Sequence, residues 1–150
     1  MIGVIAHWED IEETPYLKHI WKDTVKPLGA THLYFIDEDG TAPKEFDLEL
    51  TYKTFPTLDK ALAEHPKAHY VFLEAERNIP QSLNYWELSD FVLPEDNVFL
   101  VLGKDSDALA LENLPIDDPV IVSIKTVKGY AMWAIVVAGI VLYQRKIQWQ

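Results

Sequence analysis

The sequence predicts an α/β fold: a mostly parallel sheet of five or six strands with helices on both faces. Two observations support this prediction. Five short runs are dominated by Val, Ile, Leu and Phe with little polar alternation, which is typical of strands buried on both faces. Helical patterns lie between several of these runs, and that order favours parallel pairing. With 150 residues and 49% apolar content, the chain fits one compact domain spanning residues 1–150.

The predicted strands follow one another along the chain, and polar or glycine-containing segments follow most of them. The buried strands are Ile2–Ala6, His32–Ile36, Tyr70–Leu73, Val98–Leu102 and Val120–Ile124, and the alternating segment Asp47–Lys53 predicts an exposed edge strand. Parallel sheets bind their ligands at the carboxyl ends of the strands. The segments to search for a site are therefore 7–10, 37–40, 74–78, 103–108 and 125–130.

Two amphipathic helices are predicted in the first half of the chain. The first begins at the N-cap Thr14 and ends near Gly29, and the second begins at Thr57 and stops at Pro66. Apolar residues recur on one face of each helix: Leu17, Ile20, Trp21, Val25 and Leu28 in the first, and Leu58, Ala61 and Leu62 in the second. Each helix should therefore pack one face on the sheet.

The longest apolar run, Gly129–Tyr143, predicts the last helix. A helix that is apolar all round is buried all round. At about 1.5 Å per residue this helix reaches only ~22 Å, short of the ~30 Å hydrocarbon core, so we interpret it as a core helix and not as a membrane span. A stripe of small residues allows another backbone to approach closely: Ala131, Ala134, Ala138 and Gly139. We expect its own domain on one side and a second subunit on the other.

The amino-acid composition of the chain restricts the kinds of partner that it can bind. The net charge of −11 argues against nucleic-acid binding, which depends on Lys and Arg. One basic stripe, Lys18, Lys22 and Lys26, could contact phosphates, although the pattern favours a solvated helix face that balances a very acidic protein. The chain has no cysteine, so disulfides and thiolate metal sites are excluded. The start of the chain lacks a basic signal-peptide region, and we expect a cytoplasmic protein.

Common catalytic motifs are absent from the sequence. It contains no phosphate-binding loop, no dinucleotide fingerprint, no nucleophile elbow and no zinc-protease motif. His7, Glu9 and Asp10 are conceivable metal ligands, but they include one imidazole on an acidic loop that is more simply solvated. We therefore expect no metal.

The last third of the chain carries the informative pattern. The strand Val98–Gly103 is followed by Asp105 and Leu109, and a second strand, Val120–Lys125, is followed after six residues by the apolar helix, which ends in Leu-Tyr. This series resembles the SPOUT class of S-adenosylmethionine-dependent RNA methyltransferases, most closely the branch that methylates ribose 2′-hydroxyls. Upstream, the segment Leu28–Tyr34 looks like the first helix-to-strand junction of that class.

The resemblance implies a C-terminal trefoil knot, a homodimer formed through the last helix, and S-adenosylmethionine as the cofactor. In this class, backbone groups of three loops hold the cofactor. Carried over residue by residue, the cofactor-binding positions are Leu73, Glu74, Leu102, Gly103, Lys104, Ser123, Ile124, Lys125, Tyr130, Ala131 and Met132.

The sequence departs from the class where chemistry is expected. The Ser-Leu-Asn signature of the last helix corresponds to Ala131-Met132-Trp133, and the Asn and Arg of the first motif correspond to Leu17 and Asp23. Ser106 and Ala108 replace two glycines in the loop after Gly103, which narrows the backbone conformations open to it.

Arg77 is the candidate catalytic residue, because it follows the third buried strand and methyl transfer needs a positioned cation or base. The alternative is a surface arginine paired with Glu74 or Glu76.

Two functions are compatible with these observations. One is an RNA methyltransferase acting on a structured RNA such as tRNA, with the basic stripe on the RNA backbone. The other is a catalytically inactive knotted homodimer that serves as a cofactor-binding or protein-interaction module.

Overall fold

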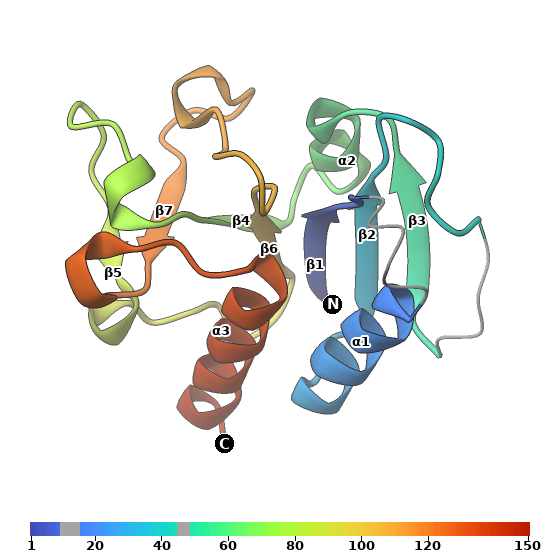
Figure 1. The fold of residues 1–150 in the computed structure, drawn as a ribbon. Coiled ribbons are helices and arrows are strands. Elements are labelled where there is room, and N and C mark those ends of the chain that lie inside the picture. Colours follow the sequence, from blue (N-terminus) through green and yellow to red (C-terminus); the bar gives the residue numbers. More distant parts are fainter. Residues whose placement is uncertain (10–15, 45–48) are drawn as a thin grey trace.

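The computed structural model describes residues 1–9, 16–44 and 49–150, and these residues form a parallel sheet with helices on both faces (Figure 1). The strands are β1 (Ile2–His7), β2 (His32–Ile36), β3 (Thr51–Phe55), β4 (His69–Leu73), β5 (Trp86–Glu87), β6 (Val98–Leu102) and β7 (Val120–Ser123). The α-helices are α1 (Leu17–Val25), α2 (Leu58–Glu64) and α3 (Ala134–Gln148). The predicted fold class is confirmed.

The sheet has the strand order β3-β2-β1-β6-β4-β7-β5, and every neighbouring pair is parallel. It has seven strands, so the predicted count of five or six was wrong. The additional strand, β5, has only two residues, Trp86 and Glu87, which pair with Val122 and Ser123. Two residues are too few to show a periodic pattern, so such a strand cannot be predicted from the sequence.

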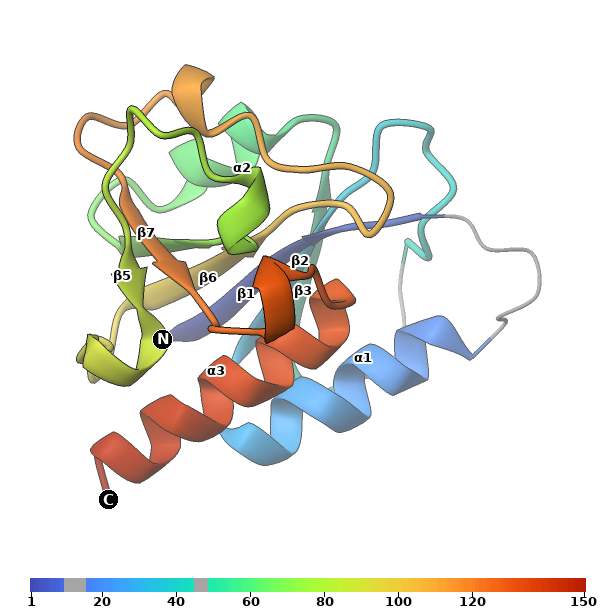
Figure 2. The same cartoon turned by 60° about the vertical axis from the view of Figure 1, so that its left-hand side comes forward.

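Two separate apolar cores cover the two faces of the sheet. On one face, α1 and α3 lie side by side and bury Trp21, Val25, Val141 and Leu142 against the central strands (Figure 2). On the other face, α2 and the loops after β4 and β6 enclose residues such as Phe99. Strands β1, β2 and β6 are buried almost throughout, as their apolar sequences predict.

The last helix begins five residues later than Gly129, and it is not buried all round. A short 3-10 turn, Val127–Gly129, precedes it, and Tyr130 has extended backbone, so the first part of the apolar run is loop. Ala138, Val141 and Leu142 face the core. A second stripe of α3 is exposed in the single chain: Val136, Ile140, Tyr143 and Ile147.

Smaller differences concern element ends. The edge strand β3 occupies Thr51–Phe55 instead of Asp47–Lys53, and α2 ends at Glu64, before Pro66. Thr57 caps α2 as predicted, because its hydroxyl oxygen accepts a hydrogen bond from the Lys60 N–H at 3.3 Å. The predicted cap Thr14 lies outside the described residues. Among the described residues, no helix is long and apolar enough to cross a membrane.

Candidate functional site

A pocket of about 310 Å³ opens at the carboxyl ends of three adjacent strands, β6, β4 and β7. We call it the cofactor pocket after the prediction from sequence, and cofactor binding there stays a prediction. The loops after these strands and the segment before α3 line it, in the place where parallel sheets bind ligands. Its apolar lining includes Leu73, Leu102, Val122, Ile124 and Val137. This volume lies at the small end of the usual range for ligand pockets, about 300–1,000 Å³.

Glu74, directly after β4, ties the loops of the cofactor pocket together. Its Oε1 accepts hydrogen bonds from the Ala75 N–H at 2.9 Å and from the Asn78 side-chain amide at 3.2 Å. Its Oε2 accepts a hydrogen bond from the Leu109 N–H at 2.9 Å. One carboxylate therefore joins the loop after β4 to the loop after β6.

Asp105 connects the loop after β6 to the last helix. Its Oδ1 accepts a hydrogen bond from the Ala134 N–H, the first residue of α3, at 2.6 Å. The N-cap residue of α3, Trp133, makes no side-chain cap, so Asp105 supplies a cap from a distant part of the sequence. The backbone is also tight at Gly103, where an added Cβ would lie 3.2 Å from the Leu109 nitrogen.

Charges in the cofactor pocket favour a positively charged ligand. Glu74, Asp105 and Asp107 line it together with Lys104. Three carboxylates and one ammonium leave a formal excess of negative charge at neutral pH, which suits a sulfonium group.

The structure brings most of the predicted cofactor-binding residues together. Nine of the eleven line the cofactor pocket: Leu73, Glu74, Leu102, Gly103, Lys104, Ile124, Tyr130, Ala131 and Met132. Ser123 and Lys125 do not line it. Ser123 is 2% exposed, and its hydroxyl has no hydrogen-bond partner among the described residues. The role of these residues in binding stays a prediction.

Arg77 lies at the rim of the cofactor pocket and not in its lining. Its guanidinium carbon is 4.4 Å from the centre of the Tyr130 ring, and its Nη2 donates a hydrogen bond to the Lys128 carbonyl oxygen at 3.4 Å. Tyr130 does line the pocket, so Arg77 contacts the site through that ring. Within the described ranges, no ion pair joins Arg77 to Glu74 or Glu76.

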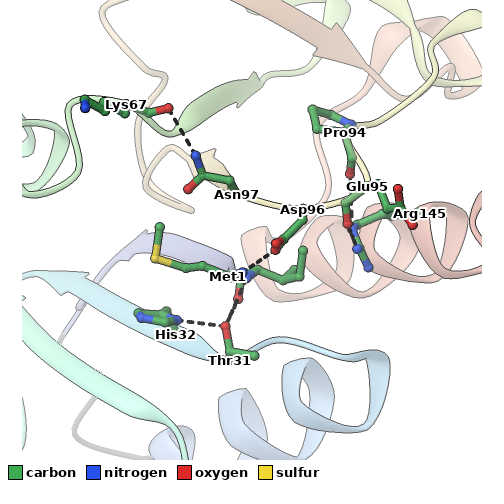
Figure 3. A network of polar contacts seen from close by, with 10 residues as sticks. Met1, Thr31, His32, Lys67, Pro94, Glu95, Asp96, Asn97 and Arg145 are labelled. Atoms are coloured by element: carbon green, nitrogen blue, oxygen red, sulfur yellow. Dashed lines mark hydrogen bonds and ion pairs between the residues drawn. The ribbon is translucent and has the colours of Figure 1, made fainter.

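Arg145, the other arginine in the sequence, cannot take the same role. It lies in the second half of α3, where its side chain donates hydrogen bonds to the carbonyl oxygens of Pro94 and Glu95 (Figure 3). These residues precede β6, so Arg145 is at the amino end of the sheet, opposite the cofactor pocket.

A second hollow, about 600 Å³, lies beside the cofactor pocket at the ends of β2, β1 and β6. We call it the His7 hollow. Its lining comprises His7, Trp8, Glu9, Ile36, Glu38, Asp39, Lys104, Asp105 and Ser106. The last three residues also line the cofactor pocket, so the loop after β6 forms a wall that the two spaces share. Asp10, named with His7 and Glu9 as a conceivable metal ligand, lies outside the described residues.

The three lysines of the predicted basic stripe are half-buried on α1 and at its end. Lys26 forms an ion pair with Glu49. This pairing reduces the positive charge that the stripe presents to a polyanion.

No family model and no curated protein matches the sequence. The fold, by contrast, matches solved structures over almost the whole chain. A TrmH/SpoU tRNA modifying enzyme from A. aeolicus is 17% identical with a TM-score of 0.69, over 98% of this chain and 74% of that one. A structure described as showing 2-OH methylation of C/U34 on tRNA is 15% identical with a TM-score of 0.69, over 98% and 95% of the two chains.

A third solved structure is the SpoU methyltransferase AviRb from Streptomyces viridochromogenes in complex with AdoMet. It is 14% identical, with a TM-score of 0.66, over 97% of this chain and 59% of that one. At these identities the likeness concerns the fold. The chain therefore has the fold of the TrmH/SpoU methyltransferases, and the predicted resemblance to the SPOUT class is confirmed at that level.

Proposed function

We propose that this chain binds S-adenosylmethionine in the cofactor pocket and transfers its methyl group. The observation that carries the proposal is the pocket itself, built by three loops at the carboxyl ends of adjacent strands in a methyltransferase fold. The residues present fit the cofactor, because apolar side chains such as Leu102 and Ile124 suit an adenine ring, and Glu74 and Asp105 suit a cationic sulfonium. When bound, the cofactor supplies an electrophilic methyl group.

The names of the solved neighbours mention tRNA modification and 2-OH methylation on tRNA, so RNA, and within it a tRNA ribose 2′-hydroxyl, is the acceptor in this proposal. In this proposal Arg77 orients the acceptor from the pocket rim, across the Tyr130 ring. The basic stripe Lys18, Lys22 and Lys26 contacts the RNA backbone, and the ion pair of Lys26 with Glu49 reduces the charge that the stripe offers. RNA is thus the first acceptor to test.

We further propose that the chain is knotted and forms a homodimer through α3. The exposed stripe Val136, Ile140, Tyr143 and Ile147 supports the dimer, because an exposed apolar helix face commonly marks an interface. Trp133, 71% exposed, extends this stripe at the start of α3. An Ile140→Glu variant should shift sedimentation from dimer to monomer, and a wild-type chain that sediments as a monomer would refute the dimer.

Isothermal titration with S-adenosylmethionine tests the cofactor site. We expect saturable heat from the wild type and loss of binding in Gly103→Val, where the larger side chain meets the Leu109 backbone. Glu112→Gln, which lines neither pocket, is the control. Absence of binding at millimolar cofactor would reject the proposal.

The alternative is a knotted module that binds the cofactor without transferring methyl groups. It is favoured by the absence of the signature hydroxyl and amide at Ala131-Met132-Trp133 and by the indirect position of Arg77. Transfer of labelled methyl to bulk RNA decides between the two. We expect transfer by the wild type and at least a tenfold lower rate in Arg77→Ala, about 1.4 kcal/mol in the barrier. Cofactor binding without transfer to any acceptor would favour the module.

A further inference from the structure

The segment between β7 and α3 forms one wall of the cofactor pocket and exposes two lysines beside it. Ile124, Thr126 and Tyr130 line the pocket. Lys125 and Lys128, in the same segment, do not line it and are exposed. The two ammonium groups are therefore available to a partner at the edge of the pocket.

Arg77 joins these lysines at the same edge. Its Nη2 donates a hydrogen bond to the Lys128 carbonyl oxygen at 3.4 Å, and its guanidinium carbon is 4.4 Å from the centre of the Tyr130 ring. We call Arg77, Lys125 and Lys128 the basic rim. Within the described ranges, none of these three cations takes part in an ion pair. The basic rim therefore keeps its charge for a partner.

The two sides of the pocket mouth carry opposite charge. On the side of β1 and β2, the His7 hollow is lined by Glu9, Glu38 and Asp39, and Lys104 is paired with Glu38 at 3.3 Å. On the side of β7, Glu76 lies beside the turn and is one carboxylate next to the three cations of the basic rim. A polyanion at the pocket mouth is therefore attracted to the β7 side and repelled from the other.

The backbone of Lys128 supports a functional role for this turn. Its φ of 54° and ψ of 22° lie in the left-handed region, which residues other than glycine seldom adopt. Strained backbone of this kind is concentrated at binding and catalytic sites. Here it accompanies the hydrogen bond from Arg77 to the Lys128 carbonyl oxygen, so the strained turn brings the cations of the basic rim together.

An exposed aromatic ring beside cations is the combination that binds single-stranded nucleic acid, because the ring stacks on a base and the cations contact phosphates. Tyr130, 50% exposed, supplies such a ring at the basic rim. We propose that the basic rim binds the backbone phosphates of a single-stranded RNA segment, with a base on Tyr130. The acceptor strand then enters the cofactor pocket from the β7 side and not across the His7 hollow. The inference rests on the proposed function and adds a second RNA contact to the one on α1.

Fluorescence anisotropy of a short labelled oligouridylate, titrated with the full chain at several potassium chloride concentrations, tests the basic rim. The slope of log affinity against log salt reports the neutralised phosphates, about 0.7 for each phosphate of a single strand. We expect Lys125→Gln and Lys128→Gln each to reduce the slope by about 0.7 and to weaken binding about threefold. Lys67→Gln, an exposed lysine before β4 at the amino end of the sheet (Figure 3), is the matched control and should change neither quantity.

Two further variants test the base contact and the direction of entry. Tyr130→Leu should weaken binding about tenfold and leave the salt slope unchanged, because the ring stacks on a base and carries no charge. Asp39→Asn, at an exposed position on the acidic side, should change the affinity by less than about twofold, because the strand does not pass there.

Four outcomes would overturn the inference. An oligouridylate that does not bind at low salt, or an unchanged salt slope in both lysine variants, would reject the basic rim. A gain of affinity in Asp39→Asn larger than the loss in Lys128→Gln would reject entry from the β7 side. Tighter binding of an RNA duplex of the same length would reject the single strand.

These measurements require no cofactor, so the basic rim and the proposed function can fail separately. Lysine variants that behave as expected, together with no S-adenosylmethionine binding in isothermal titration, would uphold the basic rim as an RNA contact and reject methyl transfer. Cofactor binding and RNA methylation, together with lysine variants that bind RNA like the wild type, would reject the basic rim alone.

Discussion

The two ends of the parallel sheet differ in their buried polar atoms, because those without a hydrogen-bond partner among the described residues all lie at the carboxyl end. At the amino end, polar groups are paired within the chain: Thr31 Oγ1 accepts a hydrogen bond from the Ile2 N–H at 2.9 Å, and Asn97 donates to the Lys67 carbonyl at 3.1 Å (Figure 3). At the carboxyl end, His7, Trp8 and Ser123 each keep a buried polar atom unpaired among the described residues. The unpaired atoms therefore lie at the same end of the sheet as the cofactor pocket.

The buried aromatic cluster beside the amino end illustrates the same pairing. The hydroxyl of Tyr34 lies 2.8 Å from His65 Nε2, and the hydroxyl of Tyr70 donates to the carbonyl oxygens of Leu62 and His65 at 2.9 Å each. Burial raises the pKa of Tyr34 to about 12, with a smaller contribution from Glu64. These hydroxyls therefore stay protonated at neutral pH and serve packing.

The largest expected effect is a loss of stability from a substitution at the closely packed amino end of the sheet. In Gly3→Ala the new Cβ would lie 2.1 Å from Phe99 Cε1, and Phe99 is fully buried in its core. We expect a loss of about 3 kcal/mol in the free energy of unfolding, measured by urea denaturation. Gly139→Ala is the control: it meets only Thr24 Cγ2 at 3.3 Å and should change stability by less than about 1 kcal/mol. Equal effects would show that β1 is loosely packed.

The next largest expected effect is on cofactor affinity, from a substitution at the carboxyl end of the sheet. Glu74→Gln keeps the shape but replaces one carboxylate oxygen by a donor, so either Leu109 or the Ala75 and Asn78 pair loses its acceptor. We expect cofactor binding to weaken about tenfold, or about 1.4 kcal/mol, by isothermal titration. Unchanged affinity would mean that these loops do not depend on Glu74 for binding.

Two substitutions that each remove one hydroxyl group compare the two ends directly, with smaller expected effects. Thr31→Val removes a paired hydroxyl and leaves the Ile2 N–H without it, which should cost about 1 kcal/mol. Ser123→Ala removes a buried hydroxyl that has no partner in the described structure, so stability should stay equal or rise. Parallel thermal and urea melts check both. A similar loss in the two variants would contradict the division between the ends.

The smallest expected effect is the pH dependence of stability. The pKa of His32 is lowered by burial, then by His65, the N-terminal ammonium and Lys53, and the pKa of His7 is also lowered by burial. The unfolded chain then binds more protons than the folded one below the ordinary value of 6.5, so stability is complete above about 6.5 and falls as the pH decreases through that value. Urea melts at about pH 7.5 and 5.5 measure this loss. His32→Gln should flatten it.

The candidate site was predictable in part. Resemblance assigned loops such as 102–104 and 130–132 to the cofactor, and they do lie together in one pocket. Sequence also placed His7 and residues 37–40 among the segments to search, because both follow buried strands. That His7 and the loop after β6 line one hollow was not predicted, because it depends on β1 lying between β2 and β6. Strand order in a sheet leaves no periodic pattern in the sequence.

The start of the last helix was mispredicted for a local reason. Residues 129–133 are mostly apolar, which resembles a helix in sequence. Lys128 and Gly129, however, have positive φ values of 54° and 69°, and Tyr130 is extended, so the chain lines the cofactor pocket before α3 begins. Asp105 then caps the helix from 29 positions away. Apolar character cannot distinguish a pocket lining from a helix.

The sequence by itself determined the buried strands, the parallel α/β class and the core-facing apolar positions of the helices, because those depend on local periodicity and on the burial of apolar side chains. Tertiary structure alone decided which loops meet, that Glu74 and Asp105 join them, and that Arg77 stays at the rim. It also left His7 Nδ1 and Trp8 Nε1 without a hydrogen-bond partner among the described residues. Those outcomes depend on strand order and on contacts between residues far apart in the chain, where each side chain finds its partner only after the sheet has formed.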